Sequence, residues 1–301
     1  MSKLTQIEDL KNGKGVRYLL EAAHKILLNP IAMLHPDYSL ITYAGSASED
    51  PLWNELISTG SFGLRTQEFF TEEYFTEDAA NMDKLVIMRS SKLKHDRIVG
   101  YVFNSEHIKV VAIVMVEYDT PFGSEDLAAF EKLEDKITTE IQNDAYFTSY
   151  GRAYHEAVIN NLLDRPIENL RLYTPHVQIL YDGFEEYLYI AVLDAPLNRA
   201  DKNSPEYYKN MLESEYKSFK YAVYSGYIVM IMSSKHMSFY QDRFFDKLNS
   251  LLEQNNLFAG ICGSFGSLYK LRKYYDNAVT ALKNGIAGGS GKRIFLYDNS
   301  I

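Results

Sequence analysis

The stretch Leu257-Phe-Ala-Gly-Ile-Cys-Gly-Ser-Phe-Gly266 decides how the C-terminal part of this 301-residue chain folds. It is an apolar run that ends at a glycine, and it predicts a strand. A helix rich in Tyr, Ala and Leu is expected from Ser267 to Gly285, and a short strand from Arg293 to Tyr297. A strand, a helix and a strand in this order indicate the last part of an α/β sandwich.

Upstream of this stretch, strand patterns and helix patterns follow one another in a defined order. The expected elements are the strand Tyr187 to Asp194, the helix Ser204 to Ser218, the strands Lys220 to Tyr224 and Tyr227 to Ser233, the helix Ser238 to Asn255 and the strand Phe258 to Gly263. This is the β-α-β-β-α-β order of a ferredoxin-like core. The terminal helix and strand extend that core.

The N-terminal part predicts an antiparallel sheet with helices. Apolar residues from Val16 to Leu28 have the spacing of one helical face, and Asn29-Pro30 is expected to end this helix. The expected strands are Ile31 to His35, Leu40 to Ala44, Leu85 to Arg89, Asp96 to Asn104 and His107 to Tyr118, with short helices and loops in the aromatic-rich segment from Asp50 to Asp83. A helix, several strands and a helical insertion on one face resemble a PAS/GAF sensor fold.

A long helix is expected to connect the two parts. Its apolar positions keep helical spacing from Ser124, with Glu125 and Asp126 in the first turn, and nothing in the pattern ends it before Asp164. A pattern of this length favours a connecting helix that pairs with its copy in a dimer, with a kink near Gly151 as the alternative. We therefore predict an α+β chain with a ligand-sensing domain at 1–123, a connecting helical segment at 124–175 and a second domain at 176–301.

The composition is that of a globular protein, with 46% hydrophobic and 24% charged residues. The longest apolar run, Val110 to Val116, is far shorter than the about 20 residues of a membrane-spanning helix. The polar and charged stretch from Met1 to Lys14 lacks the apolar region of a signal peptide. We expect a cytoplasmic protein with no membrane partner.

Charge and metal-ligating residues exclude several classes of function. Residues 1–150 carry 14 Lys/Arg against 24 Asp/Glu, and the remainder carries 17 against 16, so neither part predicts a basic DNA-binding face. The single cysteine, Cys262, allows neither an internal disulfide nor a cysteine metal cluster. The seven histidines form no zinc motif, so we expect no metal and no cofactor. The segment Gly285 to Lys292 is a helix-to-strand connection, not a phosphate-binding loop, because a helix precedes it and a strand follows it.

Several motifs together carry a resemblance to a known family. They are Asn29-Pro-Ile-Ala-Met-Leu-His-Pro-Asp-Tyr-Ser-Leu-Ile-Thr-Tyr43, Asp50-Pro-Leu-Trp53, and Arg97-Ile-Val-Gly-Tyr-Val-Phe103 followed by Val110 to Glu117. The region from Tyr187 to Tyr297 resembles the GGDEF-like domain of PucR/CdaR-type bacterial transcriptional regulators, and Val16 to Ile141 resembles the sensor domain that often precedes it. The resemblance implies a homodimer that binds DNA through a helix-turn-helix domain. That domain would begin after Ile301, and this chain does not contain it.

The resemblance also raises an enzyme hypothesis. A diguanylate cyclase needs acidic residues on its central hairpin to hold divalent metal against nucleotide phosphates. The two acidic positions fall on Gly226 and Tyr227, and Asp194 alone is more typical of a strand end. We therefore expect no catalytic residues and no enzyme. The alternatives are a nucleotide-binding or cyclase-like enzyme that uses the C-terminal domain, and a purely structural dimerisation module.

The remaining partner is an unknown small-molecule effector in the N-terminal domain. The candidate ligand-binding residues are the aromatic residues Trp53, Phe62, Phe69 and Phe70, the arginines Arg65, Arg89 and Arg97, and the hairpin residues His35 and Tyr43. Arginines among aromatic residues could fix an anionic ligand by charge-assisted hydrogen bonds. The alternative is that the aromatic residues form core and the arginines pair with acids at the surface.

Overall fold

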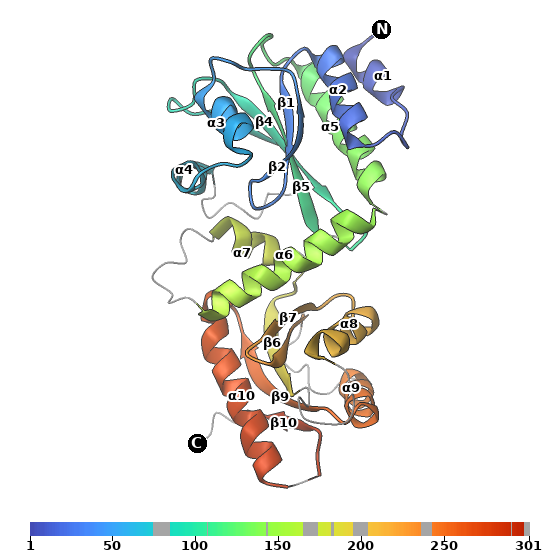
Figure 1. Cartoon of the computed structure of the whole chain (residues 1–301), viewed down its shortest axis with the longest axis vertical. Coiled ribbons are helices and arrows are strands. Elements are labelled where there is room, and N and C mark those ends of the chain that lie inside the picture. Colours follow the sequence, from blue (N-terminus) through green and yellow to red (C-terminus); the bar gives the residue numbers. More distant parts are fainter. Residues whose placement is uncertain are drawn as a thin grey trace. The chain divides into compact units, whose positions relative to one another are not determined.

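The computed structural model describes residues 1–74, 85–106, 108–142, 144–164, 174–181, 184–194, 204–235, 243–289 and 291–297. It is an α+β structure with two compact units (Figure 1). Unit 1 comprises Met1–Gly151 and Leu172–Asp182, and unit 2 comprises Arg152–Arg171 and Gly183–Ile301. Residues 124–151, predicted as part of a separate connecting segment, therefore group with unit 1. Within the described ranges, no helix combines the length and hydropathy needed to cross a bilayer.

Unit 1 contains a five-stranded sheet in the order β2-β1-β5-β4-β3, with every neighbouring pair antiparallel. The strands are β1 (Ile31–Leu34), β2 (Leu40–Ala44), β3 (Val86–Met88), β4 (Arg97–Phe103) and β5 (Lys109–Val116). These lie within the predicted strands. The predicted start of the last strand, His107, lies outside the described residues.

Helices cover both faces of this sheet. The helices are α1 (Lys3–Glu8), α2 (Val16–Leu27), α3 (Pro51–Thr59), α4 (Leu64–Tyr74) and α5 (Ser124–Ile141). Strand alternation sends Ile31 and Met33 into a core with α2 and α5, and sends Ala32 and Leu34 into a second core with α3 and α4. The second core holds the candidate site described below.

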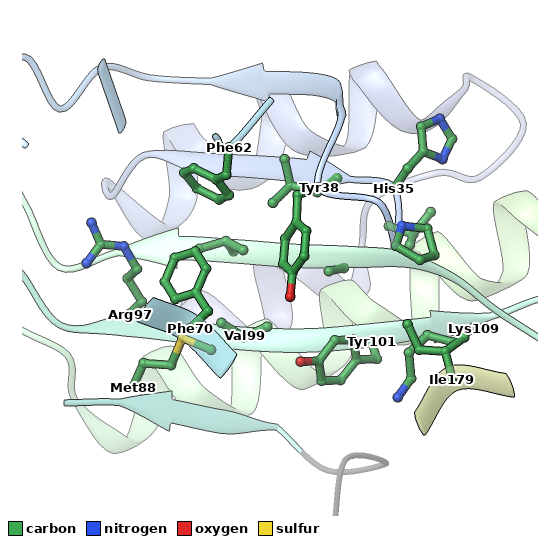
Figure 2. Close-up of a pocket in the computed structure, with 15 residues that line it drawn as sticks. His35, Tyr38, Phe62, Phe70, Met88, Arg97, Val99, Tyr101, Lys109 and Ile179 are labelled. Atoms are coloured by element: carbon green, nitrogen blue, oxygen red, sulfur yellow. The ribbon is translucent and has the colours of Figure 1, made fainter. Parts of the chain in front are cut away.

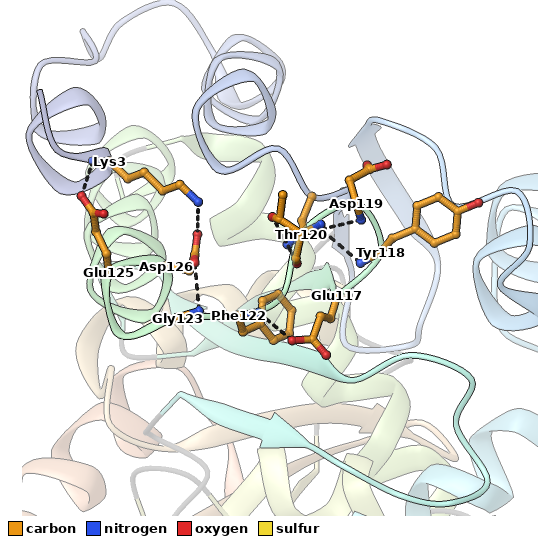
Figure 3. Close-up of polar contacts among 10 residues, drawn as sticks. Lys3, Glu117, Tyr118, Asp119, Thr120, Phe122, Gly123, Glu125 and Asp126 are labelled. Carbon is orange, nitrogen blue, oxygen red and sulfur yellow. Dashed lines mark hydrogen bonds and ion pairs between the residues drawn. The ribbon is translucent and has the colours of Figure 1, made fainter.

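The turn between β5 and α5 depends on buried polar groups (Figure 3). The side chain of Asn29, fully buried, accepts hydrogen bonds from the backbone N–H groups of Tyr118, Asp119 and Thr120 at 2.9–3.1 Å. Beside this turn, Lys3 Nζ lies 2.7 Å from Asp126 Oδ1. Asn29, which stood in the family-like motif, therefore has a structural role here.

The predicted helix from Ser124 to Asp164 is two helices, α5 and α6 (Ala145–Asp164). The side chain of Asp144 accepts a hydrogen bond of 2.8 Å from the backbone N–H of Tyr146, which starts α6 afresh. The apolar face of α5 is buried in the core of unit 1, with Phe130 and Leu133 fully enclosed. The connecting helix is therefore α6, which runs from unit 1 into unit 2 at residues 151–152. Helical spacing alone did not reveal the break.

Unit 2 contains the predicted β-α-β-β-α-β order. The elements are β6 (Tyr187–Asp194), α8 (Pro205–Glu215), β7 (Lys220–Tyr224), β8 (Tyr227–Ser234), α9 (Arg243–Gln254), β9 (Phe258–Phe265), the 3-10 turn Leu268–Lys270, α10 (Leu271–Ala287) and β10 (Ile294–Leu296). The sheet order is β10-β9-β6-β8-β7, with β10 parallel to β9 and all other pairs antiparallel. The terminal helix and strand extend the ferredoxin-like core, as predicted.

Gly260 sets how closely α10 packs on β9. A Cβ at this position would lie 2.1 Å from the carbonyl oxygen of Ala278 and 2.6 Å from the backbone nitrogen of Leu282. Any larger residue would therefore push α10 away from the sheet. The stretch Leu257 to Gly266 thus specifies both a strand and the contact of a helix with that strand.

Candidate ligand-binding site

Unit 1 encloses a cavity on the sheet face that α3 and α4 cover (Figure 2). Its volume, counted as space open to the centres of water-sized molecules, is about 70 Å³. It is lined by Leu34, His35, Pro36, Tyr38, Phe62, Phe70, Met88, Arg97, Val99, Tyr101, Lys109, Val111, Ala112, Val114 and Ile179. These come from the β1–β2 turn, the segments around α4, strands β3 to β5, and helix α7 (Thr174–Tyr181). Most of the wall is apolar, with a few polar groups that face one space.

Tyr38 enters the cavity from a strained turn. A hydrogen bond of 2.9 Å from Tyr38 N to His35 O closes the turn, and Tyr38 has a φ of 64°, in the left-handed region that a bulky residue rarely adopts. Its ring packs near Phe70 and His176, with ring centroids 6.2 and 6.0 Å away. Burial raises the pKa of the Tyr38 hydroxyl, and the phenol of Tyr101 adds to the shift. The hydroxyl is therefore a hydrogen-bond donor at neutral pH.

Arg97 forms a buried ion pair. Its Nη2 lies 2.7 Å from both carboxylate oxygens of Asp50, and its Nη1 donates to the carbonyl of His95 at 2.7 Å. Asp50 is fully buried and also accepts a hydrogen bond from Trp53 N, so it caps α3. The charge of Arg97 is thus balanced within the protein, and the pair ties α3 to β4.

Lys109 brings a second buried cation to the cavity. The residue is 2% exposed, and its Nζ lies 4.3 Å from the ring centroid of Tyr101 and 5.5 Å from that of Phe103. Cation–π contacts of this kind stabilise an ammonium group by about 0.5–2 kcal/mol. Lys109 thus brings its ammonium group between two aromatic rings at the wall of the cavity.

His35 connects the cavity to the first turns of α6. Its Nε2 lies 3.0 Å from the hydroxyl oxygen of Tyr146, and its ring stacks on Tyr150 with centroids 3.9 Å apart. Burial lowers the pKa of His35, and the carboxylate of Asp37 opposes that shift. At neutral pH His35 is therefore uncharged and joins the turn to α6.

The structure separates the predicted site residues into groups. His35, Phe62, Phe70 and Arg97 line the cavity. Arg65 and Phe69 line a second depression, which also contains Lys92 and Lys94 and which Arg97 borders as well. Trp53 is buried in the α3 core and Tyr43 lies outside it, 44% exposed, with its ring 6.1 Å from that of Trp53. Arg89 forms an exposed ion pair of 3.1 Å with Asp96.

The other eleven of the fifteen lining residues were not predicted, among them Tyr38, Tyr101, Lys109 and Ile179. A lone lysine at the start of an apolar strand was an available signal for Lys109. Tyr38 stood in the quoted hairpin motif, but its left-handed conformation has no local sequence signature. Ile179 reaches the cavity only because α7, which begins about 60 residues after the end of β5, packs with unit 1.

The hairpin of unit 2 has no carboxylate at its turn. Ser225 and Gly226 form the turn with φ values of 50° and 82°, which is the pattern of a tight two-residue hairpin. Tyr227 pairs with Asp194 across β8 and β6. Across the residues that the structure describes, no three His, Cys, Asp or Glu side chains gather as a metal site.

The sequence matches no protein-family model and no curated protein. Among solved structures, the chain is similar to the crystal structure of the E. coli DhaR(N)–DhaL complex, with 11% identity, coverage of 73% of this chain and 85% of that chain, and a TM-score of 0.30. It is also similar to the crystal structure of PelD 158-CT from Pseudomonas aeruginosa PAO1, with 11% identity, coverage of 97% and 96%, and a TM-score of 0.26. TM-scores at this level carry no argument about this chain.

Proposed function

We propose that this chain is a non-enzymatic regulatory protein in which unit 1 senses a small-molecule effector. The observation that carries this proposal is the partly open cavity on the sheet of unit 1, with its apolar wall and a few polar groups. Cavities of this composition are the usual form of small-molecule sites in proteins. The lining residues come from strands, a turn and two helices, so a ligand would contact segments that lie far apart in the sequence.

A finer proposal follows from the resemblance in the sequence. We infer that the chain is the sensory region of a PucR/CdaR-type transcriptional regulator, with a PAS/GAF-like unit 1 and a degenerate GGDEF-like unit 2. The strand orders of the two sheets support this proposal. In this proposal the protein is a homodimer, and DNA is bound by a helix-turn-helix domain outside this sequence. Light scattering on the purified chain tests the dimer.

The proposed relay uses the two helices that leave and re-enter unit 1. Helix α6 begins in unit 1 and ends in unit 2, and α7 then returns to unit 1 and contributes Ile179 to the cavity wall. A Cβ at Gly151 of α6 would lie 3.0 Å from side-chain atoms of Ile108 and Val110, so this helix lies directly against the sheet. A ligand that binds better to one arrangement of these helices would increase the population of that arrangement, and α6 would carry the change to unit 2.

We propose that unit 2 is not catalytic. Its hairpin turn, Ser225 and Gly226, offers no carboxylate to a metal ion, and Asp194 lies at the strand end beside it. The competing function is a cyclase-like enzyme. Incubation of the protein with GTP and Mg²⁺ distinguishes the two: we expect GTP to be recovered unchanged, and a cyclic dinucleotide product would contradict the proposal.

The sensing proposal is tested by thermal unfolding against a panel of purines, amino acids, sugar acids and small carboxylates. A ligand at about 100 times its Kd stabilises the native state by about 2.7 kcal/mol, which raises Tm by several degrees. Ala112→Ile adds bulk to the cavity wall without a new polar group and should abolish the response. Ala287→Ile, at an exposed position on α10, is the matched control and should leave the response unchanged.

A response that survives Ala112→Ile would place the ligand elsewhere and contradict the proposal. The panel also includes small molecules from cell extracts that native mass spectrometry detects on the protein. If no compound of this panel stabilises the protein, the proposal is contradicted as well.

A further inference from the structure

We propose that the cavity of unit 1 binds a short, uncharged carbonyl compound, such as a ketone, an aldehyde or an ester, whose oxygen accepts a hydrogen bond from the hydroxyl of Tyr38. This inference rests on the proposed sensing function and names the chemical class of its ligand. It is carried by the charges of the wall, by the balance of donors and acceptors in the wall, and by the position of the Tyr38 hydroxyl.

The charged groups of the wall already have partners within the protein. Arg97, the predicted arginine that the structure places in the wall, forms its ion pair with Asp50 at 2.7 Å. The ammonium group of Lys109 lies against the rings of Tyr101 and Phe103. A carboxylate that entered the cavity would lose its hydration without gaining a free cation, and burial of an unpaired charge is costly. The wall therefore favours an uncharged molecule.

The polar groups of the wall are mainly hydrogen-bond donors. Ten of the fifteen described lining residues have side chains without nitrogen or oxygen. The other five are His35, Tyr38, Arg97, Tyr101 and Lys109, so none of the described lining residues is an aspartate, glutamate, asparagine, glutamine, serine or threonine. A ligand with N–H groups would therefore leave them without a strong acceptor, whereas a carbonyl oxygen needs only a donor.

The hydroxyl of Tyr38 is the donor that the structure offers to such a ligand. Figure 2 shows the ring of Tyr38 entering from the β1–β2 turn, with its hydroxyl directed toward Tyr101. No hydrogen bond joins this hydroxyl to any residue that the structure describes, and its raised pKa is caused by burial and by the nearby phenol of Tyr101. A phenol that keeps its proton at neutral pH can donate to a carbonyl oxygen.

The backbone holds Tyr38 in a conformation that favours glycine. A hydrogen bond from Tyr38 N to His35 O closes the turn, and the φ of Tyr38 is 64°. Glycine is usual at this position of such hairpins, because a side chain there is strained. Strained residues collect at ligand sites, where the surrounding structure holds them in place. This turn thus places an aromatic ring and its hydroxyl in the cavity at the expense of local stability.

The volume limits the size of the ligand. The cavity of about 70 Å³ is roughly half the about 150 Å³ of an engineered protein cavity that holds benzene. The part of the ligand within the cavity therefore has roughly three to five non-hydrogen atoms. A short carbonyl compound meets this limit, with its carbon chain among apolar wall residues such as Val99, Ala112 and Val114.

The experiment compares four compounds of nearly the same shape and the same number of non-hydrogen atoms. They are butanone, the alkene in which a methylene group replaces the butanone oxygen, propionamide and propionate. Each is added to the full chain at millimolar concentration, and calorimetric titrations and Tm are recorded. We expect butanone to bind about fivefold more tightly than the alkene, which lacks the acceptor, and about tenfold or more tightly than propionamide and propionate.

Tyr38→Phe removes the hydroxyl and keeps the ring. We expect it to weaken butanone binding by about fivefold and to leave alkene binding unchanged, so that the preference for butanone disappears. Alkene binding also establishes that the cavity of this variant is intact. Tyr43→Phe makes the same change at a tyrosine of β2 that is 44% exposed and is not among the described lining residues, so this control should keep the preference.

The outcomes separate this inference from the function on which it rests. Equal binding of butanone and the alkene, or tighter binding of propionamide or propionate, would overturn the inference. If Ala112→Ile abolishes that binding, sensing in the cavity remains supported. A preference for butanone that persists in Tyr38→Phe would overturn the inference in the same way. If none of the four compounds binds, the inference is wrong, and the response of the wider panel to Ala112→Ile then decides the sensing function.

Discussion

The two sheets of this protein use the residues under their helices in opposite ways. In unit 2, Gly260 on β9 allows α10 to approach so closely that a single Cβ would lie 2.1 Å from its backbone. On the cavity face of unit 1, long side chains such as Tyr38, Phe62 and Phe70 separate the covering helices from the sheet and leave about 70 Å³ open. At about 24 cal/mol per Å³, an empty cavity of this size costs about 1.7 kcal/mol of stability. Small residues on a sheet thus allow close packing of a helix, whereas large side chains on a sheet face leave space between them.

The largest expected effect concerns the buried ion pair beside the cavity. Asp50→Ala leaves the guanidinium of Arg97 buried without its carboxylate and removes the cap of α3. We expect unit 1 to lose about 3–5 kcal/mol of unfolding free energy. Chemical denaturation followed by the fluorescence of Trp53 measures this loss. The exposed ion pair of Arg89 and Asp96 is the control, and Asp96→Ala should lower the unfolding free energy by less than about 1 kcal/mol. Equal costs at the two positions would contradict the role given to the buried pair.

Gly260→Ala tests the close packing in unit 2. The added Cβ would overlap the carbonyl oxygen of Ala278, and moving α10 away should cost about 3 kcal/mol. The control lies on the same strand, because a Cβ at Gly263 meets nothing within 4 Å. Gly263→Ala should therefore be neutral or stabilising by about 0.5 kcal/mol. Circular dichroism during urea unfolding compares the two variants, and similar stabilities would show that α10 does not depend on the glycine.

Glu134 allows a test by pH in the packed face of unit 1. Burial raises its pKa to about 7, although a hydrogen bond from the backbone N–H of Tyr101 opposes the shift. The native state thus binds this proton more tightly than the unfolded chain does, so the contribution of Glu134 to stability falls as pH rises from about 4.5 to 7.

Glu134→Gln keeps an acceptor for Tyr101 and removes the titration. Because the side chain is partly exposed, the effect is smaller than the full pKa shift implies. We expect the unfolding free energy of the variant to exceed that of the unaltered protein by about 1–2 kcal/mol at pH 8 and to differ little from it at pH 4.5. Unfolding by urea at both pH values measures this, with the exposed Glu131→Gln as the control. A difference that does not depend on pH would refute the assignment to Glu134.

The smallest expected effect concerns residues other than glycine that have a left-handed backbone conformation, one in each unit. Leu28 ends α2 with a φ of 66° and is 49% exposed, and Ser225 begins the unit 2 hairpin turn with a φ of 50°. Leu28→Gly and Ser225→Asn should each stabilise their unit by about 0.5–1 kcal/mol, because glycine and asparagine adopt this conformation more readily. Differential scanning calorimetry is the measurement. A loss of stability at Leu28 would mean that its side chain contributes more than its strain costs.

Much of the fold followed from local patterns. The strand and helix order of unit 2, and the five strands of unit 1, were predictable because apolar alternation and turn residues act over a few positions. The start of α6 was not, since the Asp144 side chain interrupts the helix without changing the apolar spacing. Helix α7 and its return to unit 1 were not predicted either. The start predicted for another helix, Ser238, lies outside the described residues. Within them, α9 begins at Arg243.

The candidate site was predicted in part. Phe62 and Phe70 reach the cavity, while Trp53 of the same insertion and the same core does not line it, because the packing of α3, α4 and the segment between them decides which ring faces the cavity. Arginine was the expected anion-binding residue, but the pairing of Arg97 with Asp50 is a contact between residues 47 positions apart. No local pattern encodes such a pair.

The sequence by itself determined the strands of the two sheets, the order of the elements along the chain and the absence of carboxylates at the unit 2 hairpin, since these depend on residue identity and on spacing over short distances. Only the tertiary structure decided which side chains share the cavity, that Lys109 is buried beside Tyr101, and that Tyr38 occupies a left-handed turn. The physical reason is that burial and strain at these residues are set by contacts among β1, β5 and α7, which are far apart in the chain. Packing brings these segments together, and the chemistry of the cavity arises there.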